Sequence, residues 1–106
     1  MITINQINEI SDKIANHFNP DKIILIGSYA SGTFHDDSDL DFLIIKDSDL
    51  PKHKRSKEIY KLFIGMKIPM DILVYSNKEY NDELNIKFSF INSALKTSKI
   101  LYERKS

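Results

Sequence analysis

Three aspartates occupy positions at which carboxylates could do chemistry together. Asp39 and Asp41 are separated by one residue at the start of the apolar run Leu40–Ile45. Because successive side chains of a strand point to opposite faces, both carboxylates would project to the same side. Asp71 lies in a second apolar run, where a carboxylate is costly unless it is paired or bound to metal. If the two runs form neighbouring strands, Asp71 could face the first pair.

Adjacent carboxylates favour a bound cation. They repel one another unless a positive group lies among them, and Mg²⁺ prefers such hard oxygen ligands. Asp39, Asp41 and Asp71 are therefore the predicted catalytic residues and metal ligands. Together they could hold two Mg²⁺ ions, the arrangement used for in-line displacement at phosphorus. Asp71 is also a candidate proton acceptor, because none of the scattered histidines is placed for that role.

A glycine and a serine upstream of the aspartates suggest a phosphate site. Gly27 and Ser28 follow the β-branched run Lys22–Ile26. Glycine lets a phosphate approach the backbone closely, and the following turn can direct N–H groups at an anion. Gly27 and Ser28 are therefore predicted to bind the triphosphate of a nucleotide. Ser38, directly before Asp39, is a secondary nucleotide-binding candidate that we expect to act mainly as a hydrogen-bonder within its loop.

Hydrophobic patterning predicts the strands that position these residues. We expect strands at Lys22–Ile26, Leu40–Ile45 and residues 68–75, and a short edge strand at residues 100–102. The second strand is apolar on both faces, which indicates a central position. Helices and strands alternate, which is typical of an α/β or α+β fold with a small mixed β-sheet flanked by helices.

Capping signals predict where helices begin. Thr3 with Gln6, and Ser76 with Glu79, match the capping box, and the first of these helices should end before Pro20. A single turn of helix is expected after Ser28.

Two more helices are expected from apolar spacing. Asp47 to Asp49 can cap a helix that begins near Pro51. Its apolar face would consist of Ile59, Leu62, Phe63 and Met66. The last helix is marked by Phe88, Ile91 and Leu95.

Length and composition restrict the class of protein. The 106 residues fit one domain, 1–106, and 42% hydrophobic residues suit an ordinary globular core. Fifteen basic and fifteen acidic residues cancel, so no overall field favours nucleic acid or membrane as a partner. The absence of cysteine excludes disulfides and thiolate metal sites. We expect a soluble cytoplasmic protein, since no signal peptide or membrane-length apolar run is evident.

Two groups of side chains are expected to have no role in catalysis or nucleotide binding. The first is a basic run expected to form a solvated face: Lys52, His53, Lys54, Arg55 and Lys57. The second is a set of aromatic residues expected in the core or on a partner surface, rather than as a platform for stacking bases: Tyr60, Phe63, Phe88 and Phe90.

The order of motifs resembles the DNA polymerase β-like nucleotidyltransferase superfamily. Its signature is Gly-Ser, ten residues, Asp-x-Asp and a third acidic residue on a later strand. This chain has Gly27-Ser28, ten residues, Asp39-Leu40-Asp41, and then Asp71. Its length and the residues in and around these motifs are similar to those of the minimal nucleotidyltransferase branch. P-loop and dinucleotide-binding glycine patterns are absent from the sequence.

This resemblance implies a nucleotidyltransferase that uses Mg²⁺ and ATP. Members of the branch are commonly encoded beside a HEPN-domain protein, and some transfer AMP to a tyrosine of that toxin and so act as its antitoxin. Two alternatives stay open. The chain could be a catalytically weak antitoxin that masks its partner by contact, or an enzyme that modifies a small molecule, although such enzymes usually carry an additional substrate-binding domain.

The chain departs from the superfamily in the turn after Gly-Ser. Many relatives carry arginine there, whereas this chain has Tyr29 and Ser31. Lys22, Lys46 and Lys67 are the basic residues that could supply a cation near the phosphates instead, but the sequence does not place them there.

Overall fold

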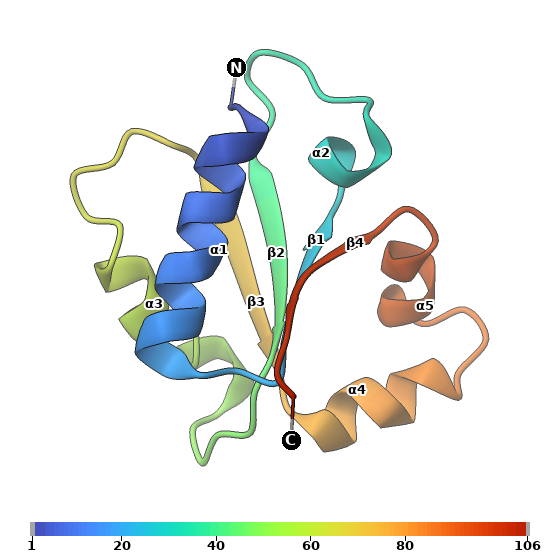
Figure 1. Cartoon of the computed structure of the whole chain (residues 1–106). Coiled ribbons are helices and arrows are strands. Elements are labelled where there is room, and N and C mark those ends of the chain that lie inside the picture. Colours follow the sequence, from blue (N-terminus) through green and yellow to red (C-terminus); the bar gives the residue numbers. More distant parts are fainter. Residues whose placement is uncertain (1, 106) are drawn as a thin grey trace.

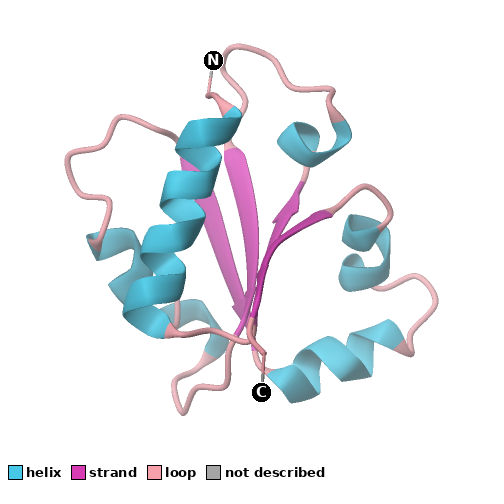
Figure 2. Ribbon diagram, viewed as in Figure 1, coloured by secondary structure: helices cyan, strands magenta, loops and turns pink. Residues whose placement is uncertain are grey.

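Four strands form one mixed sheet. The structure is a computed structural model and describes residues 2–105. The sheet consists of β1 (Lys22–Ile26), β2 (Leu40–Ile45), β3 (Met70–Tyr75) and β4 (Lys99–Glu103), in the order β3-β2-β1-β4 (Figure 2). β1 pairs antiparallel with β2 and β4, whereas β2 and β3 run parallel. The small mixed sheet flanked by helices is confirmed.

Helices cover both faces of this sheet. On one side lie α1 (Ile4–Phe18) and α3 (Lys57–Lys61), and on the other lie α4 (Asn77–Leu84) and α5 (Phe90–Leu95) (Figure 1). The short helix α2 (Ser28–Ser31) follows β1 directly. A 3-10 turn, η1 (Lys52–Lys54), precedes α3. None of the helices in residues 2–105 has the length and apolar character needed to span a membrane.

The central strand β2 divides the core in two. Phe42 and Ile44 pack on the side of α1, while Leu43 and Ile45 pack on the side of α5, and all four are buried. A strand covered on both faces must be apolar throughout, which explains why β2 lacks the alternation of a half-exposed strand. The predicted central position of this strand is confirmed.

Helix α1 forms as its capping signal predicts. The Thr3 hydroxyl accepts a hydrogen bond from the Gln6 backbone N–H at 3.2 Å, and the Gln6 side chain accepts one from the Thr3 N–H at 2.8 Å. Ile7, Ile10 and Ile14 lie buried along its inner face. Burial stabilises by about 1.5–3 kcal/mol for each such side chain, so this stripe holds the helix against the sheet.

Three predicted boundaries need correction. The helix expected near Pro51 is broken into η1 and α3, and of its predicted apolar face only Ile59 lies within α3, whereas Leu62, Phe63 and Met66 follow it. The third strand begins at Met70, because Pro69 has no N–H to donate to a neighbouring strand. The last helix begins at Phe90 rather than Phe88, since the Ser89 hydroxyl caps it by accepting from the Asn92 N–H at 3.1 Å.

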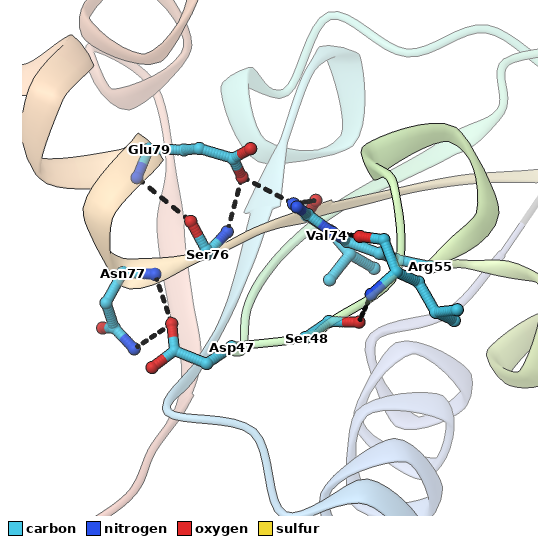
Figure 3. A network of polar contacts seen from close by, with 8 residues as sticks. Asp47, Ser48, Arg55, Val74, Ser76, Asn77 and Glu79 are labelled. Carbon is cyan, nitrogen blue, oxygen red and sulfur yellow. Dashed lines mark hydrogen bonds and ion pairs between the residues drawn. The ribbon is translucent and has the colours of Figure 1, made fainter.

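Asp47 caps a different helix from the one expected. Its Oδ1 accepts a hydrogen bond from the Asn77 backbone N–H at 2.9 Å, at the first turn of α4 (Figure 3). The Ser48 hydroxyl instead accepts from the Leu50 N–H at 3.1 Å. The prediction that Asp47 to Asp49 cap the helix near Pro51 is therefore wrong, because neither η1 nor α3 has a side-chain cap. The parallel pairing of β2 and β3 explains the change, because it places the ends of the two strands side by side.

Candidate active site

The backbone of Gly27 lies directly against the Asp41 carboxylate. Ile26, the last residue of β1, pairs in register with Asp41, so the chain turns away from the sheet at Gly27. Gly27 has φ 74° and ψ −156°, a region of backbone space that is essentially restricted to glycine. A Cβ at this position would stand 2.2 Å from Asp41 Oδ2. Both the conformation and the available space therefore require glycine here.

Asp41 and Asp71 lie side by side on the parallel strands β2 and β3. The two residues are register partners, and Asp41 is half-buried while Asp71 is exposed. The pKa of Asp41 is raised, first by its burial and then by repulsion from Asp71 and Asp39, with a hydrogen bond between the Asp41 and Asp71 carboxyls adding to the effect. The structure thus brings the three predicted aspartates within electrostatic reach of one another.

Asp39 stands at the outer margin of this cluster. It is exposed and directly precedes β2, two residues before Asp41. In a strand, that spacing returns a side chain to the same face. Its repulsion is one of the causes that raise the pKa of Asp41, which places its charge near the pair.

A cavity of about 530 Å³ opens beside the carboxylates. Gly27, Asp41 and Asp71 line it, together with the apolar or aromatic side chains of Tyr60 and Phe90. It therefore combines an acidic region with surfaces against which a flat ring can pack. The sequence places Tyr60 and Phe90 in the core or on a partner surface. They come instead to one cavity from α3 and α5, on opposite sides of the sheet, and no sequence signal reports that placement.

Ser28 and Ser38 differ in their relation to this cavity. Ser28 opens α2 immediately after Gly27. Ser38 lines a separate pocket of about 260 Å³ that also contains Lys67 and Pro69. Its hydroxyl accepts a hydrogen bond from the His35 N–H at 2.7 Å, as expected of a residue that organises its loop. The nucleotide-binding roles of Ser28 and Ser38 stay predictions.

The turn after Gly27 is filled by an aromatic stack. Tyr29 is buried and stacks on Phe34 with ring centroids 4.4 Å apart, and the Ser31 hydroxyl hydrogen-bonds Thr33 Oγ1 at 2.8 Å. At the positions where many relatives carry arginine, Tyr29 thus contacts Phe34 and Ser31 contacts Thr33. Tyr29 therefore contributes to packing at this position.

No lysine of residues 2–105 lines the carboxylate cavity. Lys22 begins β1, at the opposite end of the strand from Gly27, and pairs with Glu103 of β4 at 3.4 Å. Lys67 lines the separate pocket of Ser38. Lys52 borders a neighbouring groove of about 450 Å³, which shares Leu73 with the carboxylate cavity. Its Nζ lies 3.4 Å from the centroid of the Tyr75 ring.

One residue of the basic run is not solvated. The Arg55 side chain is only 10% exposed, and its guanidinium pairs with Glu79 Oε1 at 2.6 Å (Figure 3). The same side chain donates to the Leu50 carbonyl at 2.9 Å and the Val74 carbonyl at 3.4 Å. The expectation of a solvated face fails at Arg55, because it links η1 and β3 to the capping box of α4.

The carboxylate cluster fits a divalent cation by its chemistry. Asp39, Asp41 and Asp71 form none of the ion pairs found among residues 2–105, and the raised pKa of Asp41 reflects their mutual repulsion. A bound cation would relieve that repulsion. Within the same residues, no three acidic or histidine side chains already have the arrangement of a metal site. Coordination by all three would therefore require side-chain movement.

The chain is an enzyme of the class that transfers nucleotidyl groups, as its family shows. The family model described as "nucleotidyltransferase domain" matches residues 7–95, so the chain belongs to that family. A protein of Methanocaldococcus jannaschii named as a protein adenylyltransferase is 33% identical over 81 residues, 76% of this chain and 77% of its own length. A second protein of that organism and name is 37% identical over 54 residues, 51% and 54% of the two chains.

Solved structures share the fold at low identity. A Sulfolobus solfataricus nucleotidyltransferase superposes with a TM-score of 0.64 at 19% identity, covering 92% of this chain and 78% of its own. A toxin–antitoxin structure with AMP-PNP gives 0.63 at 20% identity, covering 92% and 74%. A mutant toxin–antitoxin MntA–HpeT structure gives 0.55 at 18%, covering 98% and 76%. These likenesses establish the nucleotidyltransferase fold.

Proposed function

We propose that this protein transfers AMP from ATP to a tyrosine hydroxyl of a HEPN-type toxin and thereby acts as its antitoxin, with Mg²⁺ as its metal. The observation that carries the proposal is the cluster of Asp39, Asp41 and Asp71 against the backbone of Gly27, at one end of a cavity large enough for a nucleotide. Membership of the nucleotidyltransferase family supplies the reaction class. The toxin–antitoxin structures of the same fold support the kind of partner.

Each residue has a distinct task in this proposal. Asp39, Asp41 and Asp71 would hold Mg²⁺, which when bound neutralises phosphate charge and stabilises the pyrophosphate leaving group. Gly27 lines the cavity and has no side chain, so phosphate oxygens could approach its backbone there. The Ser28 hydroxyl would donate to a phosphate oxygen. Asp71 is exposed at the cavity and would accept the proton of the attacking hydroxyl.

The acceptor must reach this cavity from solvent. Leu73 and Phe90 are partly exposed at its border, and Phe88 nearby in sequence is 86% exposed. Such apolar side chains beside a reaction site suit a protein acceptor that packs on them while presenting its hydroxyl. A folded protein partner fits this border better than a small polar molecule does.

The test is transfer of α-phosphate-labelled ATP, with Mg²⁺, to the product of the neighbouring gene, which this proposal expects to be a HEPN-type protein. We expect label on a tyrosine of the partner with the wild type and none with Asp41→Asn. Asp37→Asn is the matched control, because Asp37 is an exposed loop carboxylate that does not line the cavity. Equal labelling by wild type and Asp41→Asn would refute the assignment of Asp41.

A further variant separates catalysis from masking. Asp39→Ala/Asp41→Ala/Asp71→Ala should bind the toxin but fail to silence it at equal concentration if AMP transfer is the mechanism. Full silencing by this variant, verified as folded, would instead establish masking by contact. Transfer of label to small molecules and not to the toxin would establish the small-molecule alternative.

A further inference from the structure

Tyr60 lies beside the carboxylates and is also accessible to solvent. It is the tyrosine among residues 2–105 that lines the carboxylate cavity, and it is 38% exposed. On α3, Ile59 is buried in the core, as is Phe63 just beyond the helix, which turns Tyr60 toward the edge of the sheet. Its helix α3 lies on the opposite side of the sheet from α5, which contributes Phe90 to the same cavity (Figure 1).

The Tyr60 hydroxyl is held next to Asp71. β3 is an edge strand, so the N–H of Ile72 has no strand to pair with on its outer side. Tyr60 Oη accepts that N–H at 2.8 Å. The donor belongs to the peptide group that joins Asp71 to Ile72, which fixes the phenol oxygen beside the backbone of the proposed proton acceptor.

The Tyr60 hydroxyl proton has no acceptor among residues 2–105. Tyr60 Oη acts as an acceptor in its hydrogen bond with Ile72, and within residues 2–105 its O–H donates to no other group. The oxygen is thus positioned while its proton is unshared. A phenol so placed is the same chemical type of acceptor as the tyrosine that the proposed reaction requires.

We infer that the enzyme adenylylates its own Tyr60 when no partner fills the cavity. The inference rests on the proposed AMP transfer. Tyr60 Oη attacks the α-phosphorus of ATP, an O–P bond forms, and the bond from that phosphorus to the bridging oxygen breaks. Pyrophosphate leaves, and the phenol proton passes to Asp71. Adenylyl-Tyr60 occupies the cavity, so self-modification limits later transfer to the partner.

The other tyrosines make this site selective. Tyr29 and Tyr75 are buried, and Tyr29 Oη already accepts the Ile2 N–H at 3.3 Å. Tyr80 packs beside the α5-side core, and Tyr102 lies on β4, at the opposite edge of the sheet from β3. Tyr102→Phe is therefore a matched control that removes a tyrosine hydroxyl far from the carboxylates.

The test incubates the full chain with ATP and Mg²⁺ without a partner and maps the adduct by peptide mass spectrometry. We expect one adenylyl group on Tyr60, lost in Tyr60→Phe and in Asp41→Asn and kept in Tyr102→Phe. A mixture of Tyr60→Phe with Asp41→Asn should leave the latter unmodified, because the transfer is intramolecular. Modification of Asp41→Asn in that mixture would overturn the inference.

A metal-independent measurement checks the placement of Tyr60. A sulfonyl fluoride analogue of ATP reacts with nearby nucleophilic side chains without Mg²⁺. We expect it to label Tyr60 of the wild type, with excess ATP reducing that labelling. Labelling that spares Tyr60 would overturn the inference.

The two proposals can fail separately. If the wild type adenylylates the HEPN-type partner but never Tyr60, self-modification is refuted and the proposed function stands. If no acceptor receives AMP from the folded protein, both are refuted.

Discussion

Asp41 and Asp71 are register partners on neighbouring parallel strands, and the carboxyl of Asp41 also lies against the backbone of Gly27. Repulsion within this arrangement raises the pKa of Asp41. The fold therefore maintains a concentration of negative charge that does not stabilise it. Such a cost is expected where the charge serves a reaction rather than the native state.

Replacement of Asp41 should separate activity from stability. Because the folded-state pKa is raised, stability associated with protonated Asp41 is present at low pH and is lost as pH rises through that pKa. Asp41→Asn removes the repulsion and should raise the melting temperature at pH 7. AMP transfer should fall by about 100-fold or more, since stabilisation by a metal ion is worth several kcal/mol. Calorimetry and label transfer measure the two effects, and a lower melting temperature would contradict the electrostatic account.

Gly27→Ala should damage both stability and activity. The added Cβ would meet Asp41 Oδ2 at 2.2 Å, and the backbone conformation costs a non-glycine residue about 1–3 kcal/mol. Gly32→Ala is the matched control, because Gly32 also has positive φ, 83°, but an added Cβ would meet nothing within 4 Å. We expect Gly32→Ala to lower the unfolding free energy while transfer is retained. Equal transfer by the two variants would show that the clash with Asp41 does not affect the site.

The Arg55–Glu79 pair should make the free energy of unfolding fall as the pH becomes acidic. Arg55 and the hydrogen bonds of the capping box lower the pKa of Glu79 from 4.5 to about 2. A depressed folded-state pKa contributes stability above the unfolded value that is lost as pH falls through the folded value, here between about 4.5 and about 2. Because the Glu79 side chain is 35% exposed, solvent screening limits the contribution to about 1 kcal/mol.

Glu79→Gln keeps the capping geometry and removes only the charge. Its deficit relative to wild type, measured by denaturant unfolding, should be constant above pH 4.5 and should vanish near pH 2. Glu58→Gln is the control, because Glu58 is part of an exposed pair within α3. A deficit that persists unchanged at pH 2 would show that Arg55 does not act through the charge of Glu79.

Phe88→Ser should weaken the complex with the acceptor protein. Phe88 is 86% exposed, so its replacement should change the unfolding free energy by less than about 0.5 kcal/mol. Its proximity in sequence to Phe90, which lines the cavity, places it where an acceptor would pack. Ile64→Ser is the control, since Ile64 is 81% exposed in the loop between α3 and β3. Titration calorimetry should show weaker binding for Phe88→Ser alone, and equal binding by both variants would refute this role.

Local preferences of the chain account for most of its helices and strands. Thr3 with Gln6 and Ser76 with Glu79 form the capping boxes that their spacing predicts. The β-branched runs became strands at or near the expected limits, since backbone preferences and apolar patterning act over a few residues. The sequence also predicted that Gly27 lies near the first two aspartates, because only one helical turn and one loop connect β1 to β2.

Contacts between residues far apart in the chain depend on how the whole domain folds. The pairing of Asp41 with Asp71 depends on the parallel register of β2 and β3, which are joined by a long connection. Tyr60 and Phe90 line one cavity although their helices lie on opposite sides of the sheet. Arg55 belongs to the basic run but is largely buried, because it pairs with Glu79. Register and side-chain packing are non-local: they minimise the free energy of the whole core, and no short stretch of sequence contains that information.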